Sequence, residues 1–151
     1  MSILAKIDEQ IKVAMKSKDS FRLGVMRLVK AQVKNAEIEA MRPLSEPEFV
    51  AVIARMVKQR KESVEQFTKG GRADMAQNEE QEITIIQEFL PKQLSETEVE
   101  GLIKEAIQKT GAQGMQQLGA VMKELKEKTA GRVDGKLLAD KVKAMLSSRG
   151  A

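Results

Sequence analysis

The fold is decided by residues 45–90, which read SEPEFVAVIARMVKQRKESVEQFTKGGRADMAQNEEQEITIIQEFL. Apolar residues recur every three or four positions on both sides of the diglycine Gly70-Gly71, which is the spacing of amphipathic helices rather than of strands. Ser45 and Glu48 have the spacing of a capping box, and a diglycine ends a helix. We therefore expect one helix from Ser45 to the diglycine and a second running to Leu90, paired as an antiparallel hairpin.

Three charged residues fall within the apolar stripes of this predicted hairpin. Arg60 lies in the first stripe, and Glu79 and Glu82 lie in the second, at positions that come opposite one another when residues are counted outward from the diglycine. A pair at a partly buried seam fixes the register of two helices. We interpret Arg60, Glu79 and Glu82 as a structural ion pair. The alternatives are a paired acid–base site or a Mg²⁺ site formed by Glu79, Glu80 and Glu82.

The same periodicity predicts helices along the rest of the chain. Before the hairpin we expect helices from Ser2 to about Ser17 and from about Ser20 to Met41, the second burying Phe21, Val25, Leu28, Val29, Val33 and Ala36. Beyond the break at residues 90–94 we expect a helix capped by Ser95, a short one after Gly114 and a last one capped by Asp134. The predicted fold is all-α, with a helical bundle or hairpin domain over residues 1–92 and a small three-helix domain over 95–149.

The composition excludes most catalytic chemistry. The chain has 151 residues and contains no Cys, His, Trp or Tyr. These absences remove disulfides, thiolate nucleophiles, zinc knuckles and the commonest general base, and four Phe cannot build a platform for stacking unpaired bases. Phosphate-binding and dinucleotide-binding glycine motifs are also missing. We expect no catalytic residue, no metal and no cofactor.

The charge balance is mildly basic. Lys and Arg number 26 against 22 Asp and Glu, which gives a net charge of +4. This excess tolerates an anionic partner such as RNA without requiring one. Charges interrupt the N-terminal residues, and no apolar run approaches the ~20 residues of a membrane span. We therefore expect a cytoplasmic protein that does not enter the membrane.

Two groups of basic residues are candidates for contact with RNA. The first brackets the connection between the last two helices and consists of Lys123, Lys126, Lys128, Arg132 and Lys136. Local structure accounts for Gly131 and Asp134 there but not for Arg132 and Lys136, which together with the backbone N–H groups and dipole at the start of the last helix could receive a phosphate. The second group is Arg27, Lys30 and Lys34, in a region where seven basic residues accompany a single acid. The alternative interpretation of both groups is a solvated helix face.

Several short segments resemble, in their order and spacing, the YqeY family over essentially the whole chain. They are Arg60-Lys61-Glu62-Ser63, Gly71-Arg72 followed by Asp74, Glu79 and Glu82, Leu90-Pro91-Lys92-Gln93-Leu94, Leu118-Gly119-Ala120-Val121-Met122 and Gly131-Arg132-Val133-Asp134-Gly135-Lys136. From about Ser95 the chain is also similar to the tail domain of the B subunit of the tRNA-dependent amidotransferase. The resemblance implies a two-part helical fold and a role at tRNA, because that tail domain holds the body of its tRNA.

The catalytic parts of the amidotransferase do not carry over. That enzyme converts mischarged Glu-tRNA or Asp-tRNA to the amide with glutamine and ATP. Its Ser–Ser–Lys arrangement is absent here, and the chain before residue 45 is too short for its ATP- and Mg²⁺-binding domain. A label of carbon–nitrogen ligase with glutamine as amido donor would therefore describe association rather than chemistry.

These observations lead to one hypothesis and two alternatives. We expect a non-catalytic accessory module that binds tRNA through phosphate contacts, with the amidotransferase or other translation components as further partners. The first alternative is a protein-interaction adaptor that uses an exposed stripe of the N-terminal helices or a methionine-rich groove, although packing accounts for most of the nine Met. The second alternative is an enzyme.

Overall fold

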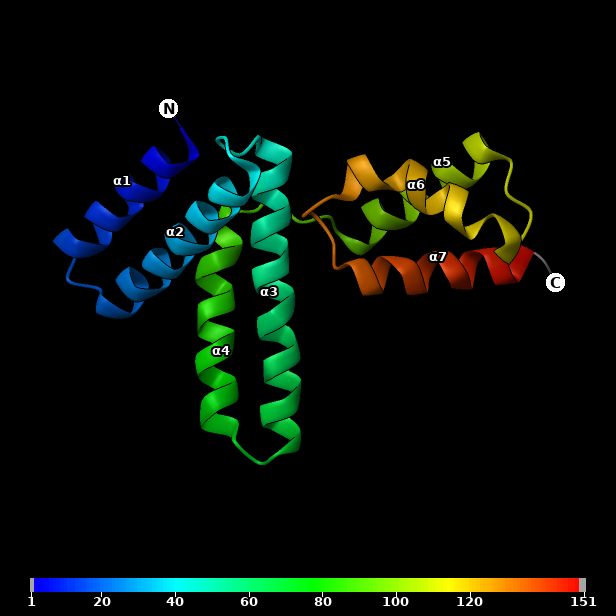
Figure 1. Cartoon of the computed structure of the whole chain (residues 1–151). Coiled ribbons are helices and arrows are strands. Elements are labelled where there is room, and N and C mark those ends of the chain that lie inside the picture. Colours follow the sequence, from blue (N-terminus) through cyan, green and yellow to red (C-terminus); the bar gives the residue numbers. More distant parts are fainter. Residues whose placement is uncertain (1, 150–151) are drawn as a thin grey trace. The chain divides into compact units, whose positions relative to one another are not determined.

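The computed structural model describes residues 2–149, which form helices joined by short turns (Figure 1). The helices are α1 (Ile3–Lys16), α2 (Ser20–Ala40), α3 (Glu46–Lys69), α4 (Ala73–Ile86), α5 (Glu96–Thr110), α6 (Leu118–Thr129) and α7 (Gly135–Arg149), with 3₁₀-helices η1 (Gln87–Phe89) and η2 (Met115–Gln117). No strand occurs within these residues, so the all-α prediction is confirmed. The chain divides into two compact units, Met1–Leu90 and Pro91–Ala151.

Unit 1 is built from two helical hairpins. α3 and α4 run antiparallel on either side of a turn in which Gly71 has a φ of +73°, a left-handed conformation that suits glycine. α1 and α2 form the second hairpin, which packs beside the first (Figure 1). The shared core consists of Ile3, Ile7, Val25, Val29, Val33, Phe49, Val52, Ile53, Met56, Val57, Ile83 and Ile86.

The helix starts follow the predicted capping residues. Ser45 and Ser95 each form a complete capping box with the glutamate three positions later, and Ser2 caps α1. The end of α4 differs from the prediction, because the α-helix stops at Ile86 rather than at Leu90 and only a 3₁₀ turn follows. Leu90 precedes a proline and is extended, with φ −82° and ψ 153°, as the proline ring requires of its neighbour.

The buried stripe of α2 also differs in part from the prediction. Val25, Val29 and Val33 are buried as expected, but Phe21 and Leu28 are 38% and 45% exposed. α2 carries apolar residues on two sides, and only one side packs against the other helices of unit 1. Periodicity alone does not tell which side faces the core.

Two methionines of unit 1, Met15 and Met75, are exposed, although packing was expected to account for most of the nine Met. Met15 lies next to the last residue of α1, and Met75 lies in the first turn of α4. Their side chains are 54% and 39% exposed. Met56, in the middle of α3, is buried as the stripe predicts.

An ion pair joins α3 to α4. Arg60 Nε lies 2.9 Å from Glu82 Oε2, and the two side chains are only 16% and 18% exposed. Arg60 also donates to the backbone oxygen of Met56. Glu79 is half-buried and forms no ion pair within residues 2–149. In the same residues no three carboxylates gather in a group that could hold a metal ion.

Unit 2 is a three-helix arrangement of α5, α6 and α7. Its core consists of Val99, Ile103, Ala106, Ile107, Ala112, Val121, Leu125, Leu138, Val142 and Leu146. Asp134 Oδ1 accepts hydrogen bonds from the backbone N–H groups of Lys136 and Leu137 and so caps α7. Val133, just before this cap, packs against the core cluster that contains Leu138.

Candidate nucleic-acid interface

The connection between α6 and α7 is held by the segment that precedes α5. Gln93 Nε2 donates to the backbone oxygen of Gly131 at 2.7 Å, and the backbone N–H of Leu94 donates to the oxygen of Arg132 at 2.8 Å. Gly131 has a φ of +71°, which lets the chain turn sharply after α6. Residues 92–94 therefore lie against the connection and form one end of unit 2 with it.

Arg132 bridges these two segments with its side chain. Its Nε donates to the backbone oxygen of Lys92 at 3.1 Å, and one terminal nitrogen donates to the oxygen of Lys128 at 3.5 Å. A guanidinium has five N–H donors, so further donors remain for an outside acceptor. The bridge brings Lys92, which the sequence reasoning did not select, to the same end of unit 2 as Lys128. No local pattern indicates this contact, because it spans forty positions.

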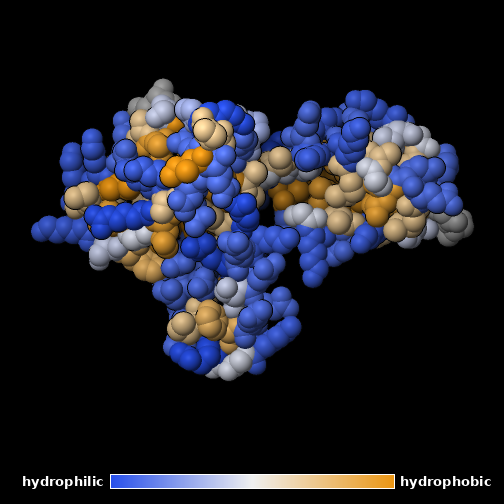
Figure 2. Space-filling model, in the orientation of Figure 1, coloured by the Kyte–Doolittle hydropathy of each residue, from blue (hydrophilic) through white to orange (hydrophobic). Residues whose placement is uncertain are grey.

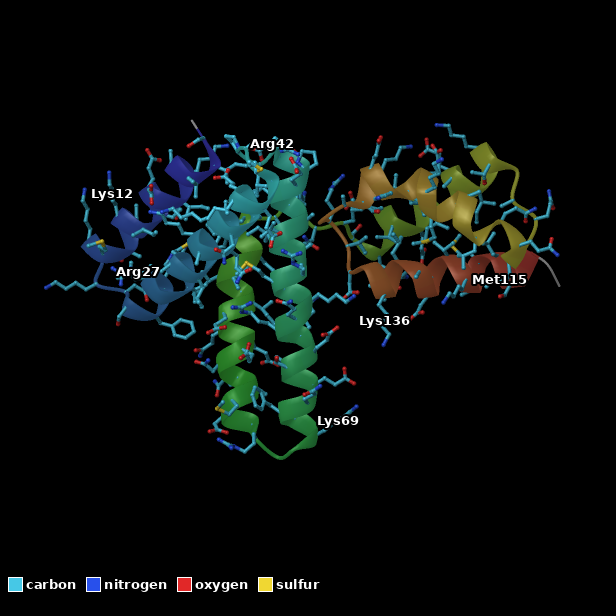
Figure 3. All side chains as sticks on the ribbon, viewed as in Figure 1. Lys12, Arg27, Arg42, Lys69, Met115 and Lys136 are labelled. Atoms are coloured by element: carbon cyan, nitrogen blue, oxygen red, sulfur yellow. The ribbon has the colours of Figure 1, made fainter. Side chains whose placement is uncertain are left out.

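The lysines predicted for this surface are exposed and have no carboxylate partner. Lys123, Lys126, Lys128 and Lys136 form no ion pair within the part of the chain that the structure describes. Figure 3 shows the Lys136 side chain extending away from α7.

Other lysines of unit 2 do have partners. Lys109 Nζ lies 2.7 Å from Glu124 Oε1, and Lys141 Nζ lies 2.8 Å from Glu96 Oε1. The hydrogen bond to Glu124 raises the pKa of Lys109, and the hydrogen bond to Glu96 raises that of Lys141. The cations around the α6–α7 connection are therefore available to an outside anion in a way that these two are not.

Two acids near the connection, Glu124 and Glu98, are engaged by other groups. Glu124 is paired with Lys109, which lowers the pKa of Glu124. The hydrogen bonds of Ser95 lower the pKa of Glu98, with a smaller contribution from Lys92 and Arg132. Their charges stay close to the connection, but their strongest hydrogen bonds are already made.

The backbone N–H groups at the start of α7 were expected to receive a phosphate, but they are not free to do so. The carboxylate of Asp134 already accepts the N–H groups of Lys136 and Leu137 and places a negative charge there. An anion at this point would meet repulsion rather than free donors. Contacts to phosphate at this end of unit 2 must therefore come from side chains.

The five predicted cations do not form a single patch. At about 100° per residue, Lys123 and Lys126 lie roughly 60° apart around α6, whereas Lys128 lies about 160° from Lys126. Lys128 is joined to Arg132 and Lys92 by the bridge described above. Unit 2 thus presents two basic clusters on different sides of α6.

The second predicted group, Arg27, Lys30 and Lys34, lies on α2, and an ion pair occupies one of its three cations. Lys30 Nζ lies 2.7 Å from Asp8 Oδ1, so this lysine ties α2 to α1. Arg27 and Lys34 are exposed and form no ion pair among the described residues. They lie two turns apart and roughly 20° from each other around the helix. Figure 3 marks the position of Arg27 on α2.

A membrane-spanning role finds no support in the helices. Within residues 2–149, none combines the length and the apolar character needed to cross a bilayer.

Comparison with known proteins identifies the family. The model of the family described as "Yqey-like protein" matches residues 4–146. The chain is 35% identical over 88 residues to "Altered inheritance of mitochondria protein 41, mitochondrial" of Lachancea thermotolerans, covering 58% of this chain and 47% of that protein. The protein of the same name from Pyrenophora tritici-repentis is 24% identical over 151 residues, covering 97% of this chain and 82% of the relative. In the Lachancea and Eremothecium gossypii matches the chain spans about half the length of the relative. The chain belongs to the YqeY family.

Proposed function

We propose that this chain is a non-catalytic accessory protein that binds tRNA through the basic end of unit 2. We use the name basic end for the two clusters of unit 2 together, with Lys136 at the start of α7: Lys92, Lys123, Lys126, Lys128, Arg132 and Lys136. The observation that carries the proposal is the contrast in pairing: these lysines have no carboxylate partner among the described residues, while Lys109 and Lys141 of the same unit do. Unpaired, solvent-exposed cations are the groups that replace counterions on a phosphate backbone.

The mode of recognition follows from the side chains present. Without Trp or Tyr the chain cannot read unpaired bases by stacking, so contacts to phosphates and to duplex shape remain. The bridge to Lys92 and Lys128 holds the Arg132 guanidinium in place before RNA arrives. A side chain that is already ordered loses less conformational entropy on binding.

The biological setting is part of the same proposal. Family membership and the resemblance of residues from Ser95 to the amidotransferase tail domain support a role beside charged tRNA. The amidotransferase or another translation component is then the protein partner. We propose the cytoplasm as the compartment, and imaging of the tagged protein tests it, since relatives carry mitochondrial names.

The experiment is a binding series with the full chain, total tRNA and a random duplex of equal length at increasing salt concentrations. Each phosphate contact is expected to add about 0.7–0.9 to the slope of log affinity against log salt. We expect tRNA to bind with a slope that corresponds to several contacts, and more tightly than the duplex. Absence of binding even in dilute buffer would refute the proposal.

A protein-interaction adaptor is the second candidate function. The observation that favours it is the exposed apolar side of α2, where Phe21 and Leu28 are not covered by unit 1. Pull-down of a protein partner that survives RNase treatment, without retained RNA, would separate this function from tRNA binding.

A further inference from the structure

A second apolar stripe runs along the exposed side of α2. Its members alternate at spacings of three and four positions: Phe21, Gly24, Leu28, Ala31, Asn35 and Ile38. This is the a and d spacing of a heptad repeat. All six residues are exposed, Ile38 to 73%. We call these six residues the outer stripe, which is separate from the buried stripe of Val25, Val29 and Val33.

Exposed apolar residues are concentrated in this part of unit 1. Of the nine large hydrophobic side chains that are exposed within residues 2–149, six lie between Val13 and Met41. Figure 2 shows hydrophobic side chains at the surface over α1 and α2, among hydrophilic ones. Contiguous exposed apolar surface bordered by polar groups is typical of a site for a partner.

The outer stripe has room for a second helix. A Cβ added at Gly24 would meet no heavy atom within 4 Å. Gly24 and Ala31 both occupy d positions, and small residues there let a partner backbone approach closely. Asn35 occupies an a position, where a polar residue selects register and partner at a cost in stability.

The charges beside the stripe indicate what kind of helix fits. Arg27 and Lys34 each precede an a position, which places them at g positions, and both are exposed. Residues 20–36 contain no Asp or Glu. Because g residues face the e or g residues of the opposite helix, the complementary helix carries acids there.

A second copy of the chain fits these charges less well. An antiparallel copy would set Arg27 against Lys34, which are like charges. A parallel copy would pair Lys34 with Glu39 but would set Arg27 against the neutral Gln32. Charge complementarity therefore favours a different, acidic partner.

We propose that the outer stripe of α2 docks an amphipathic helix from another protein, with an apolar seam and Asp or Glu on the flank that faces Arg27 and Lys34. The stripe from Phe21 to Ile38 is about 26 Å long, which matches a partner helix of about five turns. This surface is separate from the basic end of unit 2, so the two sites can be tested independently.

The probe is a synthetic three-heptad peptide with Leu at a and d and Glu at e and g, and its control carries Lys at e and g. Fluorescence anisotropy of each labelled peptide is measured against the full chain. We expect the Glu peptide to bind at least tenfold more tightly than the Lys peptide. Leu28→Gln, an exposed substitution, is expected to weaken binding at least tenfold, and Arg27→Glu with Lys34→Glu is expected to reverse the preference. Circular dichroism checks that each variant retains its helices.

Three results would overturn this inference. The first is equal binding of the two peptides, or binding that Leu28→Gln leaves unchanged. The second is loss of tRNA affinity rather than of peptide affinity in Leu28→Gln, which would make the stripe an RNA surface. The third is a concentration-dependent dimer that Leu28→Gln abolishes, which would make the partner a second copy. Because tRNA affinity is measured separately with variants of the basic end, failure here leaves the proposed function standing.

Discussion

Arg132 Nε lies 3.1 Å from the backbone oxygen of Lys92, forty positions earlier in the chain, and donates a hydrogen bond to it. The same side chain reaches the backbone oxygen of Lys128. One arginine thus fastens the segment before α5 to the connection after α6 and gathers three cations at one end of unit 2. Its role in stability and its proposed contact with RNA must therefore be measured separately.

Arg132→Ala is expected to destabilise unit 2. The substitution removes two hydrogen bonds to backbone oxygens, each worth about 1 kcal/mol or less at a partly exposed site. We expect the free energy of unfolding of unit 2 to fall by about 1 kcal/mol. Native-state hydrogen exchange of the α6 and α7 amides measures this change. Lys128→Ala, which removes a side chain but not the backbone acceptor, should change it by less than about 0.5 kcal/mol; equal effects would show that the bridge contributes nothing.

Arg60→Met is expected to destabilise the α3–α4 hairpin. Glu82 would be left without its partner at a site that is 18% exposed, and losing one member of a partly buried pair costs about 1–3 kcal/mol. Denaturant unfolding of the full chain, with hydrogen exchange in α3, gives the value. The double variant Arg60→Met with Glu82→Leu should recover most of the loss, because no uncompensated charge remains. A double variant that is less stable than Arg60→Met would contradict this expectation and would mean that Glu82 stabilises the hairpin even without Arg60.

Glu48 should make the stability of unit 1 depend on pH in the acid range. The hydrogen bonds from Arg42, followed by those from Ser45, lower the pKa of Glu48 from 4.5 to about 2. Because the folded pKa is below the unfolded one, this stabilisation is complete above about pH 4.5 and is lost as the pH falls towards about 2. We expect the difference in unfolding free energy between the natural chain and Glu48→Gln to shrink over that window. A difference that stays constant from pH 7 to pH 2 would contradict the assignment.

Gly101→Ala is expected to stabilise unit 2. Gly101 lies inside α5, and a Cβ there would meet nothing within 4 Å. Glycine in a helix interior is about 0.5–1 kcal/mol less favourable than alanine. A gain of that size in the unfolding free energy, with unchanged tRNA affinity, is the expected result. A loss of stability would mean that the added methyl group meets a neighbour.

Local signals in the sequence were sufficient for the class and order of the helices. The capping boxes at Ser45 and Ser95 and the aspartate cap at Asp134 operate over three residues, so no tertiary information is needed to find them. The end of α4 was misplaced because the effect of Pro91 on Leu90 competes with a continuing apolar pattern.

The features that the sequence did not reveal depend on contacts between distant residues. Met26 is buried while Phe21 and Leu28 are exposed, because the packing of the hairpins decides which side of α2 faces the core. Lys92 lies at the basic end because its backbone oxygen accepts a hydrogen bond from Arg132, forty positions later, and Lys30 is not a free cation because it pairs with Asp8 of α1. Charge counts along the chain do not distinguish a paired lysine from a free one.

The most direct test of the account compares charge reversals in tRNA binding over a series of salt concentrations that begins in dilute buffer. Lys126→Glu and Lys128→Glu represent the two clusters of the basic end, and Arg72→Glu, at the turn between α3 and α4, is the matched control. We predict that each lysine reversal weakens binding of total tRNA at least threefold and lowers the salt slope by about 0.7–0.9, while Arg72→Glu changes neither. Equal loss in all three variants, or no loss in any, would contradict the claim that tRNA is held at this end of unit 2.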